Sequence, residues 1–242
     1  MKVEIWSDVV CPWCAIGKSR FEAAVERFEH GDQVEVVWRS FELDPTAPHR
    51  HEGDLVERLA SKYGMSREQA EASQAHLTTM AADEGLDFHF ERAQSGNTFD
   101  AHRLLHLAGE HGRQGELKDR LFRAYFTEGE PIGDPATLRR LAVEVGLDPA
   151  AVDAVLAGDT YAEAVRADEA EASALGVSGV PFFVVDRRFG VSGAQPADLL
   201  LDVLQQAWVD QPPLTMVAAG ADAADVWDAD GCAVPEGPAA AS

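Results

Sequence analysis

The chain has 242 residues, 46% of them hydrophobic, so it is too long for a disulfide-stapled miniprotein and has enough apolar side chains for a sizeable core. Its 42 acidic and 20 basic residues give a formal net charge of −22, which argues against binding to nucleic acids or anionic membrane surfaces. The three cysteines, Cys11, Cys14 and Cys232, are too few and odd in number for the disulfide framework of a secreted scaffold.

The first part of the chain has the pattern of a β-α-β unit. Residues 2–6 are rich in strand formers, residues 15–30 carry an apolar stripe at helical spacing, and residues 33–43 are again rich in β-branched and aromatic side chains. Cys11 and Cys14 therefore lie where the first predicted strand meets the helix.

Helical patterns then continue from about residue 53 to residue 175. Capping and stop signals divide this stretch into six predicted helices, with boundaries marked by Gly64, Ser66 with Gln69, Asn97, Asp134-Pro135, Asp148-Pro149 and Leu175-Gly176. Roughly 120 residues of helix without a strand are too many for one crossover connection in a small α/β sheet. We therefore expect an inserted helical domain.

Strand signals return near the C-terminal end. Residues 182–185 and 189–191 form a predicted hairpin, and a helix follows over residues 197–209. The last residues are rich in Ala, Gly and Asp, a composition typical of a mobile tail. The predicted organisation is a discontinuous α/β domain over 1–47 and 174–213, a helical insertion over 48–173, and an acidic tail over 214–242.

Two cysteines separated by two residues at the start of a helix can close and open a small disulfide. The unpaired N–H groups and the positive end of the helix dipole stabilise a thiolate at Cys11, which makes Cys11 the expected nucleophile. Pro12 suits the first helical turn because it has no N–H group. Cys14 lies one turn further along and is the expected resolving thiol, which attacks the mixed disulfide on Cys11.

Two structural roles compete with this redox interpretation. A structural zinc site normally needs four nitrogen or sulfur ligands, and the chain has no second Cys-x-x-Cys pair. His102 and His106 could share one helix face, but such histidines are more often solvated, so no metal is expected. A pair of inert core cysteines fits poorly with the Pro12-Trp13 insert at a strand–helix junction.

The N-terminal residues favour a cytoplasmic chain. Glu4 and Asp8 interrupt the segment, which has no apolar run long enough for a signal-peptide core. No later stretch has the roughly 18 apolar residues of a membrane-spanning helix. Cytoplasmic thiols are normally kept reduced, so a Cys-x-x-Cys pair there favours catalysis or metal binding over a structural role.

Three segments resemble the DsbA-like thioredoxin-fold proteins, specifically their FrnE-type branch. Residues 3–8 leading into Cys11-Pro12-Trp13-Cys14 resemble the opening of these proteins, residues 176–183 resemble their cis-proline loop, and residues 97–103 resemble a segment of their helical insertion. The resemblance covers about residues 2–209. It implies an α/β, thioredoxin-like fold with a large all-helical insertion domain.

The resemblance also implies a binding site around the cysteines. A cis Val180–Pro181 bond would face them, and the backbone of Val180 would then bind an extended substrate. Trp13 beside the nucleophile is expected to pack against a partner side chain, the alternative being packing between the two domains. Asn97 and His102 are also expected to contact the substrate. The alternative role of Asn97 is a helix N-cap, and the alternative for His102 is a solvent-facing side chain. The expected substrate contacts are Pro12, Trp13, Asn97, His102, Val180 and Pro181.

The chain departs from the family pattern at two places. The periplasmic archetype has a histidine where this chain has Trp13, so we expect a less oxidising dithiol. Some FrnE-type proteins resemble one another in a C-terminal Cys-x4-Cys pair. Here Cys232 matches the later position and Trp227 stands at the earlier one. Cys232 is therefore expected to be a spare thiol rather than a partner for intermolecular exchange.

The expected activity is that of a cytoplasmic thiol-disulfide oxidoreductase or isomerase acting on protein or small-molecule disulfides. We expect no bound cofactor, no nucleic-acid or membrane partner, and a monomer or homodimer. One alternative is an isomerase or transferase of the hydroxychromene-carboxylate isomerase type, acting on a small, polyketide-like molecule with glutathione as co-substrate. The resolving Cys14 argues against it, because glutathione would enter a stable disulfide cycle. The other alternative is a non-enzymatic holdase that binds unfolded peptides.

Overall fold

The computed structural model describes residues 1–51 and 53–209. The predicted tail over residues 214–242, with Trp227 and Cys232, lies outside the described residues. No helix within the described part of the chain is long and apolar enough to cross a membrane.

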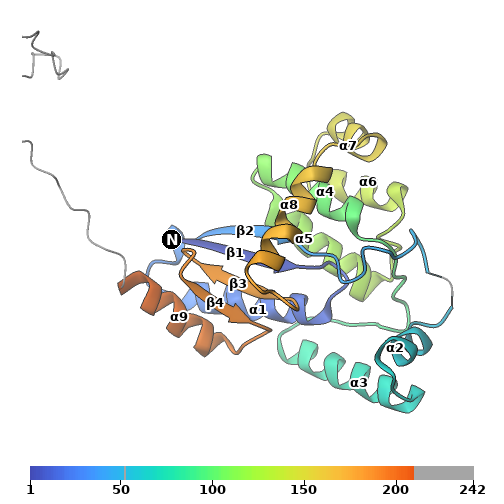
Figure 1. The fold of residues 1–242 in the computed structure, drawn as a ribbon, viewed down its shortest axis with the longest axis horizontal. Helices are drawn as coiled ribbons and strands as arrows, with labels where there is room; N and C mark the ends of the chain where they lie inside the picture. The colour runs from blue at the N-terminus through green and yellow to red at the C-terminus, as the bar shows by residue number, and fades with distance from the viewer. Residues whose placement is uncertain (52, 210–242) are drawn as a thin grey trace, which may run out of the picture. The chain divides into compact units, whose positions relative to one another are not determined.

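A mixed sheet has the strand order β2-β1-β3-β4 (Figure 1). Strand β1 (Lys2–Ser7) pairs parallel with β2 (Glu35–Ser40) and antiparallel with β3 (Phe182–Val185), which pairs antiparallel with β4 (Phe189–Ser192). The β1–β2 pair confirms the predicted β-α-β unit, and the β3–β4 pair confirms the predicted hairpin.

Side chains alternate between the two faces of β1 because successive residues of a strand point to opposite sides. Val3 and Ile5 pack with helices α1 (Pro12–Arg27) and α9 (Ala197–Val209) in one apolar cluster. Trp6 packs on the opposite face with Ala172 of helix α8 (Ala162–Ala174). Figure 1 shows α1 and α9 on one side of the strands and α8 on the other. Both faces of the central strand are therefore buried.

A buried ion network ties α8 to the sheet. Asp168 Oδ1 accepts from Arg39 Nη1 at 2.9 Å, and its Oδ2 accepts from the Ser40 amide at 2.8 Å and lies 3.2 Å from His106 Nε2. The Asp168 carbonyl accepts from Trp6 Nε1 at 2.9 Å. One residue of α8 thus holds β1, β2 and α4 together.

The edge strand β2 is covered along part of its length by one side chain of the insertion. Gln114 Oε1 accepts from the Trp38 amide, and Gln114 Nε2 donates to the Trp38 carbonyl, each at 2.9 Å. The side-chain amide thus forms the same pair of hydrogen bonds that a neighbouring strand would form.

The helical insertion runs between β2 and β3. Its helices are α2 (Leu55–Tyr63), α3 (Arg67–Asp83), α4 (Phe99–Glu110), α5 (Gln114–Arg123), a π-helical turn η2 (Ala124–Glu128), α6 (Pro135–Glu144), α7 (Pro149–Ala157) and α8 (Ala162–Ala174). The predicted Ser66–Gln69 capping box is present, and Asp134 and Asp148 cap α6 and α7 as predicted. The thioredoxin-like fold with a helical insertion is therefore confirmed, while the exact domain boundaries stay a prediction.

The structure corrects two predicted helix boundaries. The sixth predicted helix is two helices, because the chain breaks at Gly158 and adopts a left-handed conformation at Tyr161, with φ of 65°. Thr98, not Asn97, is the N-cap of α4. Asn97 Oδ1 still accepts a hydrogen bond from the Phe99 amide at 2.9 Å, so its cap-like chemistry lies one residue earlier than expected.

Candidate dithiol active site

Cys11 is the N-cap residue of α1, and Cys14 lies in the first turn of the same helix. The Cys11 amide donates to the Asp8 carbonyl at 3.2 Å, and the Cys11 carbonyl accepts from the amides of Cys14 and Ala15. Pro12 occupies the first helical position, as its missing N–H group favours. Cys11 is 4% exposed, Cys14 is fully buried, and both thiols are free. An attacking partner can therefore reach only Cys11.

The loop before β3 lies against Cys11. Val180–Pro181 is a cis peptide bond, and Cys11 Sγ donates to the Val180 carbonyl at 3.5 Å. Pro181 is buried and Val180 is half-buried, whereas Trp13, between the two cysteines, is 40% exposed. The structure thus brings five predicted residues together: Cys11, Trp13, Cys14, Val180 and Pro181.

Gly17 is a site residue that the sequence analysis missed. It lies on α1, and a Cβ added there would be 2.8 Å from Pro181 Cγ, too close for the rigid ring to yield. The absence of a side chain at Gly17 therefore lets the proline loop approach the helix that carries the cysteines. A glycine inside an amphipathic helix is the signal that could have found it.

Replacing Gly17 with alanine is expected to slow disulfide exchange at Cys11, because the methyl group moves Pro181 and the Val180 carbonyl away from the thiol. Overpacking of this kind costs about 1–3 kcal/mol and outweighs the roughly 1 kcal/mol that alanine gains as a helix former. Thermal unfolding and the exchange rate measure the two effects. Gly115→Ala on α5, where a Cβ meets no atom within 4 Å, is the control, and equal behaviour of the two variants would contradict the prediction.

A buried polar cluster lies next to the dithiol. Asp8 Oδ2 accepts from the Leu43 amide at 2.8 Å, and Asp8 Oδ1 lies 3.4 Å from His102 Nε2, an electrostatic contact rather than a well-aligned hydrogen bond. Burial opposes ionisation of Asp8, but His102 and the Leu43 amide outweigh it and hold the pKa of this carboxyl below its usual range. Burial also lowers the pKa of the His102 imidazole.

His102 and Asn97 are not exposed next to Trp13. His102 is 1% exposed and lies next to Asp8, so the alternative of a solvent-facing side chain is wrong, and its role as a substrate contact stays a prediction. The Asn97 side-chain amide donates to Glu42 Oε1 at 3.4 Å and to the Pro45 carbonyl at 3.5 Å. The half-buried Asn97 therefore bonds to the loop after β2.

Glu42 is a second residue that the sequence did not single out. Its carboxylate is fully buried and accepts from Arg166 at 2.5 Å. Burial, together with the nearby Glu169 carboxylate, raises the pKa of Glu42 to about 7. No charge pattern around residue 42 indicates this, because Arg166 and Glu169 come from α8, more than 120 positions away.

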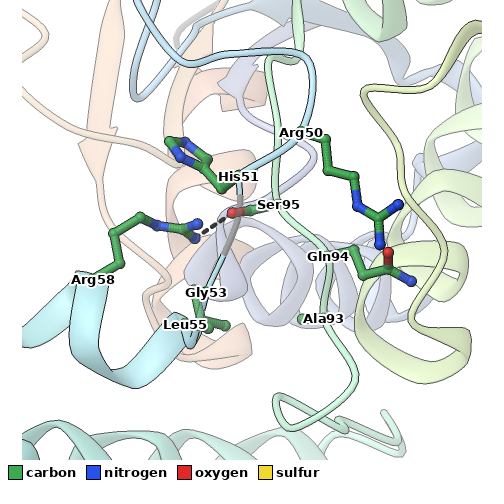
Figure 2. A pocket seen from close by; sticks show the side chains of 8 residues that line it. All are labelled: Arg50, His51, Gly53, Leu55, Arg58, Ala93, Gln94 and Ser95. Carbon is green, nitrogen blue, oxygen red and sulfur yellow. Dashed lines mark hydrogen bonds between the residues drawn. The ribbon is translucent and has the colours of Figure 1, made fainter.

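A pocket of about 460 Å³ opens at the start of α2 (Figure 2). Arg50, His51 and Arg58 line it, and Figure 2 shows the Arg58 guanidinium bonded to the Ser95 hydroxyl. Ser95 in turn bonds to the buried Tyr125, whose pKa burial raises to about 12 and whose hydroxyl also senses the charge of Asp8.

No group of three or more His, Cys, Asp or Glu side chains is placed to hold a metal ion among residues 1–51 and 53–209. The thiolate chemistry available at Cys11 is nucleophilic attack on a disulfide, and a second thiol one turn away can displace the product.

Comparisons with known proteins agree with this geometry. The sequence profile of the DSBA-like thioredoxin domain matches residues 2–205. The chain is 32% identical over 190 residues to the uncharacterized protein YwbO of Bacillus subtilis, covering 76% of this chain and 86% of the relative. The crystal structure of the probable DsbA oxidoreductase SCO1869 from Streptomyces coelicolor matches with a TM-score of 0.88 at 50% identity, covering 98% of this chain and 100% of that one.

A more distant structure has the same fold. The cytosolic disulfide reductase DsbM from Pseudomonas aeruginosa, solved with GSH, matches with a TM-score of 0.60 at 21% identity, covering 85% of this chain and 98% of that chain. At this identity the match shows similarity of fold alone.

Proposed function

This chain belongs to the DSBA-like thioredoxin domain family, as its sequence motifs predict, and from that premise we propose that it is a thiol-disulfide oxidoreductase that cycles Cys11 and Cys14 between dithiol and disulfide. The observation that carries the proposal is the unequal exposure of two free thiols in one helical turn. Cys11 caps the helix and keeps 4% of its surface exposed, whereas Cys14 one turn further along has none. This is the arrangement that separates a nucleophile from a resolving thiol.

The reaction takes two exchanges. The Cys11 thiolate, stabilised by the N-terminus of α1, attacks a substrate disulfide, and the first substrate sulfur leaves with the electron pair of the broken bond. Cys14 then attacks Cys11 Sγ in the mixed disulfide, closes the Cys11–Cys14 bond and releases the second substrate sulfur. In the opposite direction the same steps transfer the disulfide to a substrate dithiol.

The surroundings of Cys11 support a disulfide carried by a peptide or a small thiol. The Val180 carbonyl beside Cys11 is a backbone acceptor for an extended chain, and the exposed Trp13 ring offers an apolar contact. The pocket at the start of α2, with the guanidinium groups of Arg50 and Arg58, is a place where an acidic thiol such as glutathione could bind as co-substrate. A cytoplasmic location is consistent with both, since free thiols persist in a reducing compartment.

Trapping with Cys14→Ala tests the proposal. Without the resolving thiol the mixed disulfide on Cys11 has no internal route to break, so covalent adducts should accumulate when the protein meets its partners under mild oxidation. Non-reducing electrophoresis and mass spectrometry would identify them. Cys11→Ala is the matched control and should trap nothing at this site. An absence of Cys11 adducts would contradict the proposal, and peptide binding unchanged in both variants would favour the holdase.

A further inference from the structure

A buried lysine lies on helix α5, whose Leu117 and Leu121 belong to the same buried apolar cluster as Cys11 and Cys14. Lys118 on α5 is fully buried, and its Nζ donates to the Ser7 carbonyl at 3.4 Å. The ammonium also lies 5.5 Å from the centre of the Trp38 ring and 5.2 Å from that of Phe122. Ser7 ends β1, four residues before Cys11, so α5 brings a positive charge to the end of the sheet from which the cysteine motif leaves.

The charge of Lys118 is stabilised by groups of the dithiol site. Burial lowers the pKa of Lys118 to about 8, and the negative charges of Cys14, Asp8 and Cys11 oppose this effect, in that order of size. The positive charge of Lys18 on α1 lowers the pKa of Lys118 further. A buried ammonium is costly unless it is paired, and here the ionised Asp8 carboxylate attracts it, as a thiolate formed at Cys14 would.

Burial also disfavours the ionised form of Cys14. Burial, and next the neighbouring Cys11, raise the pKa of the Cys14 thiol well above its usual value. A resolving thiol must nevertheless become a thiolate to attack, because the thiol itself is not the nucleophile. The positive charge that opposes burial at Cys14 is the ammonium of Lys118.

Asp8 and His102 are the further polar groups of this environment. The Asp8 carboxylate attracts the ammonium, and the Asp8 backbone carbonyl bonds to the Cys11 amide. His102 of α4 contacts the Asp8 carboxylate at 3.4 Å and also senses the charge of Lys118. The insertion thus contributes an imidazole and an ammonium to a site whose cysteines lie in the other domain.

We propose that Lys118 is a positioning residue of the resolving step: its ammonium stabilises the Cys14 thiolate while that thiolate attacks Cys11. The inference rests on the proposed function. In this step the Cys14–Cys11 S–S bond forms and the bond between Cys11 and the substrate sulfur breaks. The electron pair goes to the substrate sulfur, which takes up the proton that Cys14 has lost. The helical insertion thereby sets the reactivity of the second cysteine.

A two-phase exchange assay tests the inference. The reduced protein, in a Cys232→Ser background so that only Cys11 and Cys14 react, is mixed with the aromatic disulfide 5,5′-dithiobis(2-nitrobenzoate). The first coloured thiolate reports attack by Cys11, and the second reports attack by Cys14 on the mixed disulfide. Lys118→Met should slow the second phase about tenfold or more at neutral pH, because a pKa rise of one unit removes nine-tenths of the thiolate. The deficit should shrink above about pH 8, where Lys118 itself loses its charge, and disappear where Cys14 ionises in both proteins.

Lys18→Met is the matched control. Lys18 is also a buried lysine near Trp38, but Glu22 and Asp119 pair with its ammonium at 2.5 and 2.6 Å. Because the charge of Lys18 opposes that of Lys118, the second phase of this variant should be at least as fast as that of the wild type at neutral pH. Circular dichroism checks folding, and Lys118→Gln replaces the methionine variant if that one does not fold. An unchanged second phase in the Lys118 variant, or one slowed equally at every pH, overturns the inference. A wild-type protein that releases no second thiolate overturns the proposed function itself.

Discussion

Replacing Cys11 with serine is expected to abolish disulfide exchange, with a loss of more than about a thousandfold in rate. A serine hydroxyl is not ionised at neutral pH and forms no bond to sulfur that a thiol can reverse, so both steps of the cycle are lost. The fold should persist, because serine is nearly isosteric with cysteine and the residue makes its backbone hydrogen bonds through its own amide and carbonyl. Reduction of a model disulfide and thermal unfolding, measured on the same sample, separate activity from stability.

The control for this variant is Cys232→Ser, which should keep wild-type exchange. Cys14→Ser should give an intermediate result, in which the first exchange still occurs and the product stays attached to Cys11. Activity retained in Cys11→Ser would mean that the reaction does not pass through this sulfur. Such a result would move attention to the glutathione-dependent alternative, in which the thiol is brought by the co-substrate.

Replacing Asp168 with alanine is expected to have the largest effect on stability among the polar substitutions considered. The change leaves the Ser40 amide and the Arg39 guanidinium without the carboxylate that binds both. We expect the free energy of unfolding to fall by about 3 kcal/mol. This is the lower end of the range for removing one partner of a buried ion pair, because Arg39 still pairs with Glu4. For a folded part of this size that corresponds to a fall in Tm of about 6–12 °C.

The effect of Asp168 should depend on pH. Burial disfavours its ionised form, but His106, the Ser40 amide and Arg39 hold the pKa of this carboxyl below its ordinary value of 3.8. A lowered folded-state pKa means that the contribution is complete above 3.8 and is lost as the pH falls through the folded-state value. The gap in Tm should therefore narrow in acid. Asp153→Ala, which breaks a surface pair with Arg139, should leave Tm nearly unchanged at every pH, and similar losses in the two variants would contradict the assignment.

Local signals made much of the fold predictable. The Ser66 capping box, the Asp-Pro starts of α6 and α7, and the alternation of strand and helix around Cys11 are each encoded within a few residues. The proline loop before β3 could be connected with the cysteines only through a family resemblance, because about 170 residues separate them. Where a local signal was absent, as at the break between α7 and α8, the predicted boundary was wrong.

The buried polar residues were the part that the sequence did not reveal. Lys118 and Ser7 are 111 residues apart, and Asp168 and Arg39 are 129 apart. A local sequence pattern of a few residues therefore cannot show that these side chains meet. Helical spacing shows that His102 and His106 share one helix face, but it does not show whether that face contacts solvent or the protein interior. The usable signal was Lys118 itself, a charge between Leu117 and Leu121 on the apolar side of α5.

The Gln114–Trp38 pairing has a consequence for the behaviour of the protein at high concentration. An unprotected edge strand offers its amides and carbonyls to other chains and so is a route to aggregation and domain swapping. At the middle of β2 these two groups are already bonded to a side chain from α5. A second molecule would have to displace that amide before it could add a strand there. The side chain of one glutamine from the insertion thus blocks strand addition at the middle of β2, one of the two edge strands of the sheet.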